Sequence, residues 1–191
     1  MKFDIIMPTF KRQHCIDNTI KTILGQTHQD WSLIIVDNDG SQPYSFEDPR
    51  IKCFVHRERQ SAAYARNRGV RYASGDVICF FDDDDSMHPE YLTSIVEAFH
   101  QYPKAKMVTV KMDANAERPR LRYATPCCAV KREFVQALWA NVGQLQDQRY
   151  FKGMIRKNRW IQGRDIQHVD KVLVFVGHSP EGGLRHERGN F

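Results

Sequence analysis

The 191-residue sequence lacks the features of a membrane-spanning or secreted chain. Its longest unbroken apolar runs, residues 77–81 and 172–176, have the length of strands, whereas a membrane-spanning helix needs about 20 apolar residues. The first ten residues carry Asp4 and Pro8 where a signal peptide would be apolar. The sequence therefore predicts a cytoplasmic protein with at most peripheral membrane contact.

Paired cysteines are also missing. The five cysteines are odd in number and contain no CxxC spacing, and Cys79 lies inside an apolar, strand-like run. A zinc site or a disulfide framework is therefore not expected, and the pattern is typical of reduced thiols.

Internal repeats and low-complexity tracts are absent, and the length suits a single domain with a proper core. The formal net charge is +5 and the isoelectric point is about 9.0. This balance suits an anionic ligand, an anionic acceptor or an acidic membrane surface, and it does not choose among them.

Positive charge is missing next to four consecutive aspartates. Asp82, Asp83, Asp84 and Asp85 follow the apolar run at residues 77–81, and no lysine or arginine stands within five residues on either side. A helix N-cap explains one such residue and leaves a surplus of negative charge. We favour a divalent cation, Mn²⁺ or Mg²⁺, held by carboxylate oxygens and completed by substrate phosphates. The balancing charge is thus expected to come from outside the chain.

Apolar periodicity predicts an α/β protein with a largely parallel sheet and helices on both faces. Strands are expected over residues 3–7, 31–37, 51–55, 77–81, 106–112 and 171–176. Helices are expected over residues 12–24, 61–73, 132–139 and 146–158 and after Pro89. Residues 113–126 are expected to form a long, mobile loop.

Three polar loops follow expected strands, at residues 8–12, 37–41 and 82–85. In parallel α/β sheets, ligands bind in the crevice beyond the carboxyl ends of the strands. The three loops therefore predict one binding site at this edge of the sheet.

Four stretches occur in a characteristic order: IIMPTFKR, QTHQDWSLIIVDNDGS, RQSAAYARNRGVRYASGDVICFFDDDD and MHPEYL. The set resembles the donor-binding half of inverting family 2 glycosyltransferases with the GT-A fold, closely over residues 3–100 and loosely over 124–160. The resemblance implies one GT-A domain over residues 1–191. Its nucleotide-sugar-binding half would span residues 1–103, and its acceptor-binding half with a C-terminal tail would span 104–191.

The resemblance also implies a donor site. The loop after the first strand lines the nucleoside, and the acidic loop after the second strand reads the base. Because DNDGS is one residue longer than the usual run, Asn38 and Asp39 both stay candidates for the base-reading position. The implied nucleotide-sugar-binding residues are Pro8, Thr9, Phe10, Arg12, Asp37, Asn38, Asp39, Arg66, Asp82 and Asp83.

The metal motif of the family is Asp-x-Asp, which Asp82 and Asp84 match, with Asp85 as a trailing acid. Asp84 is the first choice for direct coordination. A bound cation would neutralise charge on the departing diphosphate. Some related enzymes add a late histidine, here His178, although a polar tail explains this residue equally well.

The general base of the family belongs to an acidic pair that opens a later helix. Asp147 occupies this position, preceded by Gln146 instead of the common Glu. A helix N-terminal acid favoured by the helix dipole is the other explanation of Asp147. Asp113 and Asp165 are weaker candidates. The implied reaction is inverting transfer from a nucleotide-diphosphate sugar, most commonly a UDP-sugar, to an acceptor hydroxyl.

The acceptor stays open among a glycan, a lipid-linked sugar, a protein and a modified nucleic acid. Basic residues continue from Arg149 to Arg164, which is the ordinary pattern of a solvated helix face and also suits a phosphate-rich acceptor, a lipid head group or a nucleic acid.

Two other classes of protein are alternatives to a glycosyltransferase. A haloacid-dehalogenase-like phosphatase would need an aspartate directly after the first strand, where MPTFKR has none. A non-catalytic nucleotide-binding or nucleic-acid-binding module would suit the basic charge.

Overall fold

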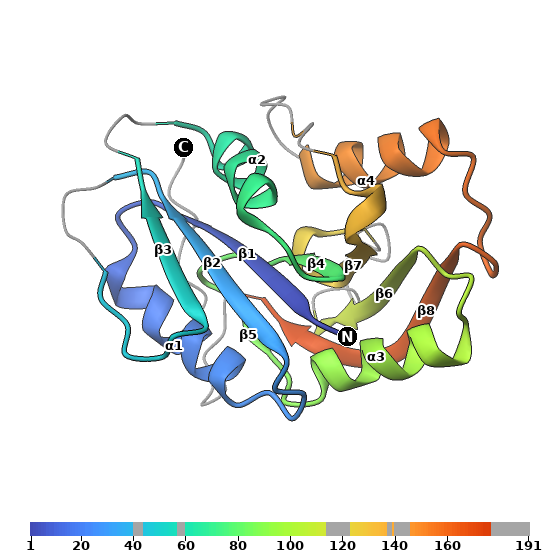
Figure 1. Ribbon diagram of the computed structural model, residues 1–191, viewed down its shortest axis with the longest axis horizontal. Coiled ribbons are helices and arrows are strands. Elements are labelled where there is room, and N and C mark those ends of the chain that lie inside the picture. Colours follow the sequence, from blue (N-terminus) through green and yellow to red (C-terminus); the bar gives the residue numbers. More distant parts are fainter. Residues whose placement is uncertain (40–43, 57–59, 114–122, 137–138, 140–145, 177–191) are drawn as a thin grey trace.

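The computed structural model describes residues 1–39, 44–56, 60–113, 123–136, 139 and 146–176. Within them lies an eight-stranded sheet with the strand order β3-β2-β1-β4-β7-β6-β8-β5 (Figure 1). Its strands are β1 (Phe3–Thr9), β2 (Trp31–Asp37), β3 (Ile51–Val55), β4 (Val77–Phe80), β5 (Ser86–Met87), β6 (Met107–Met112), β7 (Cys128–Lys131) and β8 (Ile166–Phe175). The α-helices are α1 (Gln13–Leu24), α2 (Ala62–Tyr72), α3 (Tyr91–Gln101) and α4 (Gln146–Lys157).

The two halves of the sheet differ in strand direction. Strands β3, β2, β1 and β4 are all parallel, and every residue of β1 and β4 is buried, as expected for central strands covered on both faces. Beyond β4 the sheet is mixed, because β7 runs antiparallel to both β4 and β6, whereas β8 runs parallel to β6. The predicted α/β class with a largely parallel sheet is confirmed, because among the described strands only β7 and β5 run opposite to the others.

Helices α2 and α4 cover one face of the sheet. Ile6 and Phe80 are register partners in β1 and β4, so their side chains point to the same face. Gly69 of α2 packs so closely on Ile6 that an added Cβ would collide with this side chain. Phe80 makes edge-to-face contacts with Trp139 and with Phe151 of α4, with ring centroids 5.1 and 6.3 Å apart. Such pairs contribute about 0.5–1.5 kcal/mol each beyond burial.

Helices α1 and α3 lie together on the other side (Figure 1). Gln26, just after α1, donates a hydrogen bond to the His88 carbonyl and accepts one from the Leu92 N–H at the start of α3. These bonds join the end of one helix to the beginning of the other. None of the helices in the described part of the chain is long and apolar enough to cross a membrane.

The helix predicted over residues 132–139 is wrong. Only Arg132–Phe134 forms a short 3₁₀ turn, and Val135 is already extended. Arg132 is held at the start of β4, because its N–H donates to the Asp76 carbonyl and its Nε donates to the Gly75 carbonyl. These tertiary bonds override the local helical pattern.

The structure also differs from the prediction, or leaves it partly undescribed, in two other segments. Strand β8 begins at Ile166, earlier than the predicted start at residue 171. Most of the loop predicted over residues 113–126 lies outside the described residues, and its last part enters a 3₁₀ turn over Thr125–Cys127.

Candidate active site

The ends of β1, β2 and β4 meet at one edge of the sheet. Thr9 and Asp37 are register partners at the ends of β1 and β2. The Phe81 N–H donates to the Ile6 carbonyl at 2.9 Å, which continues the pairing of β4 with β1 up to the aspartates. The predicted convergence of the loops that follow these strands is confirmed.

The last residue of β1 and the loop after it hold two of the four aspartates. Thr9 Oγ1 donates to Asp83 Oδ2 at 2.7 Å. The Arg12 guanidinium donates to Asp83 Oδ1 at 3.1 Å and to Asp84 Oδ2 at 2.7 Å. Burial raises the pKa of Asp83 to about 7, although the bond from Thr9 and the charge of Arg12 act in the opposite direction. Neutralisation of Asp83 is thus within reach at physiological pH.

Helix α2 supplies a second arginine. An Arg66 Nη atom donates to Asp82 Oδ1 at 2.6 Å, and its guanidinium carbon lies 4.7 Å from the centre of the Trp139 ring. Arg66 is buried, with 5% of its surface exposed, and its Nε and other Nη have no hydrogen-bond partner in the described part of the chain. An unsatisfied buried donor costs roughly 1–3 kcal/mol, so an anion bound here would be stabilised.

The charge that the sequence neighbourhood lacks comes partly from within the chain. Arg12 and Arg66 lie 71 and 16 residues from the aspartates that they contact, beyond the window in which the sequence shows no basic residue. The expectation that all balancing charge comes from outside the chain is therefore corrected. Four carboxylates face two guanidinium groups, so at most two negative charges stay unbalanced.

Exposure alternates along the aspartates. The Asp82 and Asp84 side chains are 34% and 36% exposed, whereas the Asp83 side chain is 7% exposed and Asp85 is buried. The backbone carbonyls of Asp83 and Asp85 both accept from Thr19 Oγ1 of α1, at 2.9 and 2.8 Å, which holds the loop in this orientation. The two Asp-x-Asp positions thus face solvent and the other two face inward.

These residues suit a divalent cation only together with a substrate. Over the described ranges, no group of three His, Cys, Asp or Glu side chains is arranged to hold a metal ion. Mg²⁺, however, is commonly bound by one or two carboxylates and completed by phosphate oxygens and water. Asp82 and Asp84 fit this mode, and buried Asp85 fits it less well. His178 lies outside the described residues.

The loop after β2 separates its two candidates for base recognition. The buried Asn38 donates its N–H to the Thr9 carbonyl at 3.0 Å and turns its side-chain amide toward the carbonyls before α2. Asp39 donates its N–H to Asp37 Oδ1, and its carboxylate lies 3.9 Å from Lys11 Nζ. Asn38 therefore fixes the loop, whereas Asp39 lies closer to the surface.

The two remaining residues that were predicted to contact the nucleoside differ in burial. Phe10 is half-buried at the end of β1, but Pro8 is buried within the strand opposite Val36. Sequence reasoning missed Tyr44, whose half-buried hydroxyl lies beside Thr9. Burial and the charges of nearby carboxylates raise the pKa of Tyr44. An aromatic residue shortly after the acidic loop was the available signal.

Helix α4 brings Asp147 to the same edge. Its Oδ1 accepts from the Gln148 N–H at 2.7 Å, and its Oδ2 accepts from the Thr125 N–H at 3.2 Å. Burial raises the pKa of Asp147; the charge of Asp82 raises it further and that of Arg66 lowers it. Because both charges act on this pKa, Asp147 shares the electrostatic environment of the aspartate cluster.

The two weaker candidates for a base have other roles. Asp165 lies at the opposite edge of the sheet, where its carboxylate contacts Arg164 at 2.8 Å and Lys106 at 3.1 Å. The hydrogen bonds from Arg164 are the largest cause that lowers the pKa of Asp165 to about 2. Asp113 follows β6 and accepts the Val176 N–H at 3.0 Å, which fastens the end of the sheet.

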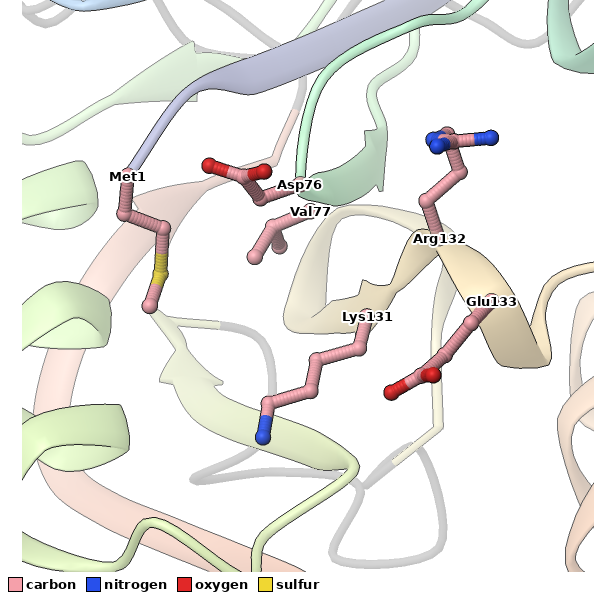
Figure 2. A pocket seen from close by; sticks show the side chains of 6 residues that line it. All are labelled: Met1, Asp76, Val77, Lys131, Arg132 and Glu133. Atoms are coloured by element: carbon pink, nitrogen blue, oxygen red, sulfur yellow. The ribbon is translucent and has the colours of Figure 1, made fainter.

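A separate hollow of about 350 Å³ lies at the start of β4 (Figure 2). It is lined by Met1, Asp76, Val77, Lys131, Arg132 and Glu133. Val77 is the first residue of β4, whereas the aspartates follow the carboxyl end of this strand. In parallel α/β sheets, ligands bind beyond the carboxyl ends of the strands, so the hollow lies at the opposite edge from the expected site.

The sequence model of Glycosyl transferase family 2 matches residues 4–162. The chain belongs to this family. Family 2 membership excludes the phosphatase alternative, and the predicted family is confirmed.

Relatives among known proteins include two bacterial glucosyltransferases. The UDP-Glc:alpha-D-GlcNAc-diphosphoundecaprenol beta-1,3-glucosyltransferase WfgD of Escherichia coli is 40% identical over 86 residues, which are 42% of this chain and 34% of that protein. The GalNAc(5)-diNAcBac-PP-undecaprenol beta-1,3-glucosyltransferase of Campylobacter jejuni is 32% identical over 104 residues, which are 50% of this chain and 34% of that protein. The matched regions thus span about a third of the length of these relatives.

Solved structures show the same fold. The mannosyltransferase PcManGT from Pyrobaculum calidifontis, in complex with GDP-Man and Mn²⁺, has a TM-score of 0.71 at 17% identity, over 92% of this chain and 56% of that one. TarS 1–349 of S. aureus, in complex with UDP-GlcNAc, has a TM-score of 0.67 at 15% identity, over 92% and 58%. The family 2 chain therefore has the predicted GT-A fold.

Proposed function

We propose that this chain binds a nucleotide-diphosphate sugar, with a UDP-sugar as the first choice, and transfers the sugar to an acceptor hydroxyl with inversion. One observation carries the proposal: solvent-facing Asp82 and Asp84, the unsatisfied donors of Arg66 and the half-buried Asp147 converge at one edge of the sheet. The donors named for a relative and for two structural neighbours, UDP-Glc, UDP-GlcNAc and GDP-Man, support a nucleotide-sugar donor.

In this proposal the donor lies across the carboxyl ends of β1, β2 and β4. Phe10 and Asp39 contact the nucleoside, with Asp39 on the base because Asn38 is committed to the loop. The free N–H groups of Arg66 bind diphosphate oxygens. Arg12 orients Asp84 through its 2.7 Å contact, and Asp82 and Asp84 hold Mn²⁺ or Mg²⁺. The bound cation supplies Lewis-acid stabilisation of the leaving diphosphate.

Asp147 accepts the proton of the acceptor hydroxyl while that oxygen attacks the anomeric carbon from the face opposite the diphosphate. Its backbone hydrogen bonds orient the carboxylate, and each oxygen keeps a further lone pair for the hydroxyl. The raised pKa of Asp147 makes it a stronger base than an ordinary aspartate. We take the transition state to resemble an oxocarbenium ion, as in glycoside hydrolysis.

A sugar carried on a lipid diphosphate is the acceptor class that we propose. Its support is the pair of relatives named for diphosphoundecaprenol or PP-undecaprenol acceptors.

Thermal unfolding with UDP, GDP or dTDP, each with Mn²⁺, Mg²⁺ or a chelator, tests the donor site. A nucleotide at about one hundred times its dissociation constant adds roughly 2.7 kcal/mol of stability. For a chain of this length, each kcal/mol raises the melting temperature by about 2–4 °C. We expect the largest rise with UDP and a metal.

Two variants sharpen this test. Asp84→Asn should lose the metal-dependent part of the rise, whereas Asp170→Asn, which alters a 77% exposed acid on β8, should keep it. A rise that ignores the metal would remove the cation from the proposal. The absence of a rise with any nucleotide would favour the non-catalytic binding module.

A further inference from the structure

The segment that begins at Asp147 carries a continuous run of positive charge. Between Gln148 and Arg164 there are six basic residues and no acidic ones. All six are exposed. This basic surface consists of Arg149, Lys152, Arg156, Lys157, Arg159 and Arg164.

Helix geometry places the first of these charges together. Gln148, Phe151 and Met154 form the buried face of α4. Arg149, Lys152 and Arg156, at positions i, i+3 and i+7, therefore lie on the opposite, solvent-facing side. Their electrostatic fields add on the outer side of α4, the helix at the upper right of Figure 1.

Within the described part of the chain, no ion pair joins Lys152, Arg156, Lys157 or Arg159 to an acidic side chain. Asp165, the acid that follows Arg164, is shared between Arg164 and Lys106. Lys157 Nζ donates to the neutral Gln136 amide at 3.0 Å. The charge of Lys152, Arg156, Lys157 and Arg159 is thus available to an anionic partner.

Helix α4 and the segment after it expose an apolar side chain, whereas the rings of Tyr150 and Trp160 pack against the protein. Arg159 adopts a left-handed conformation with φ of 52°, after which Trp160 turns inward and Ile161 is 51% exposed. Tyr150 stacks on Trp139 at 4.2 Å. Single-stranded nucleic acids use exposed aromatic rings, whereas an apolar side chain among basic residues is typical of a helix lying on an anionic membrane.

We propose that this basic surface docks the protein on an anionic lipid bilayer, with α4 lying along the head groups and Ile161 inserted at its end. Asp147 opens the same helix, so docking would bring the candidate base to the membrane surface. That last consequence, which concerns a lipid-linked acceptor, rests on the proposed function; the docking itself does not.

Vesicle flotation with the full chain tests the docking. The probes are phosphatidylcholine vesicles with and without phosphatidylglycerol, at low and high salt. The wild type should bind only the anionic vesicles and dissociate as salt rises. Lys152→Glu/Arg156→Glu should weaken the partition coefficient by about 30-fold or more, since each basic residue contributes about one factor of five.

The matched control is Lys21→Glu/Lys52→Glu, which changes the net charge equally at two exposed lysines on α1 and β3. It should bind anionic vesicles like the wild type. Ile161→Ser should weaken the binding that persists at high salt. All variants should melt like the wild type, because the altered side chains are exposed.

Equal binding to neutral and anionic vesicles, or equal loss in the control, would overturn the assigned surface. Binding of RNA or DNA through Lys152 and Arg156 without vesicle binding would overturn the lipid partner. The UDP and Mn²⁺ melting shift, measured on the same variants, separates these failures from failure of the proposed function, because it reports the donor site alone.

Discussion

Asp83 and Asp165 are buried carboxylates at opposite edges of one sheet, and their electrostatic surroundings differ in sign. Asp165 accepts hydrogen bonds from Arg164, Lys106 and the Ile161 N–H, and its pKa is lowered to about 2. Asp83 shares one arginine with Asp84, and burial raises its pKa to about 7.

The difference teaches how one fold uses the same residue type for two purposes. At the Asp165 edge, positive partners neutralise the carboxylate, and its contacts hold the start of β6 to the segment before β8. At the Asp83 edge, negative charge exceeds positive charge and Arg66 has unsatisfied donors. Unbalanced charge and unsatisfied hydrogen-bond donors that a ligand would satisfy are typical of a binding site.

The largest expected effect is on catalysis. Asp147→Asn should reduce sugar transfer by about 10²–10⁴-fold, because it removes the base and keeps the shape. UDP binding, followed as a melting shift with Mn²⁺, should persist. The matched variant Asp165→Asn should keep transfer, measured well below its melting temperature. Comparable loss of transfer in both variants would contradict the assignment of the base.

The next effect is on stability. Asp165→Asn should lower the free energy of unfolding by roughly 1–3 kcal/mol, because charge-assisted hydrogen bonds from Arg164 and Lys106 are lost. The stabilisation by this carboxylate should be present above pH 4 and disappear as the pH falls through about 2. Urea titrations of both proteins give the comparison, and an unchanged midpoint would refute it.

Removing the charge of Asp83, at the other edge of the sheet, should change the free energy of unfolding in the opposite direction. Asp83→Asn should raise the unfolding free energy of the ligand-free protein at pH 8 by about 0.5–2 kcal/mol, because a carboxylate ionised at a cost is removed. Because the pKa of Asp83 is raised, the protonated Asp83 side chain stabilises the folded state relative to the ionised one. This stabilisation is fully present below about pH 4 and is lost as the pH rises through about 7.

Urea titrations at several pH values measure this contribution. The wild type should lose stability relative to Asp83→Asn across that interval. A variant that is less stable at pH 8 would show that the Arg12 contact outweighs the burial of charge.

The smallest expected effect is on the low-pH side of the pH profile of kcat/KM for sugar transfer. Burial raises the pKa of Asp147, so kcat/KM should fall with decreasing pH at values above the usual aspartate range. Because the charge of Asp82 also raises this pKa, Asp82→Asn should move the limb toward lower pH in its residual activity. If the acid limb of the kcat/KM profile stays at the same pH in Asp82→Asn, the charge of Asp82 does not act on the group that titrates in transfer.

Local patterns predicted most of the strands and helices. Short apolar runs located β1, β2, β3, β4 and β6, and helical stripes located α1, α2, α3 and α4. The pattern at residues 132–139 failed, since hydrogen bonds from Arg132 to the start of β4 outweigh a weak local preference. The family resemblance placed Arg66 near the acidic cluster, and its hydrogen bond to Asp82 agrees with this; Asp147 as the general base stays a prediction.

The sequence by itself determined the order of most helices and strands, the place of four aspartates after β4 and the family, because these depend on residues close together in the chain. Only the tertiary structure decided that Arg12 and Arg66 hold the cluster, and that Asp82 and Asp84 face solvent. It also decided that Asp165 is neutralised. These partners are joined by sheet pairing and helix packing across long stretches of sequence, and no local periodicity encodes which side chains such packing brings together.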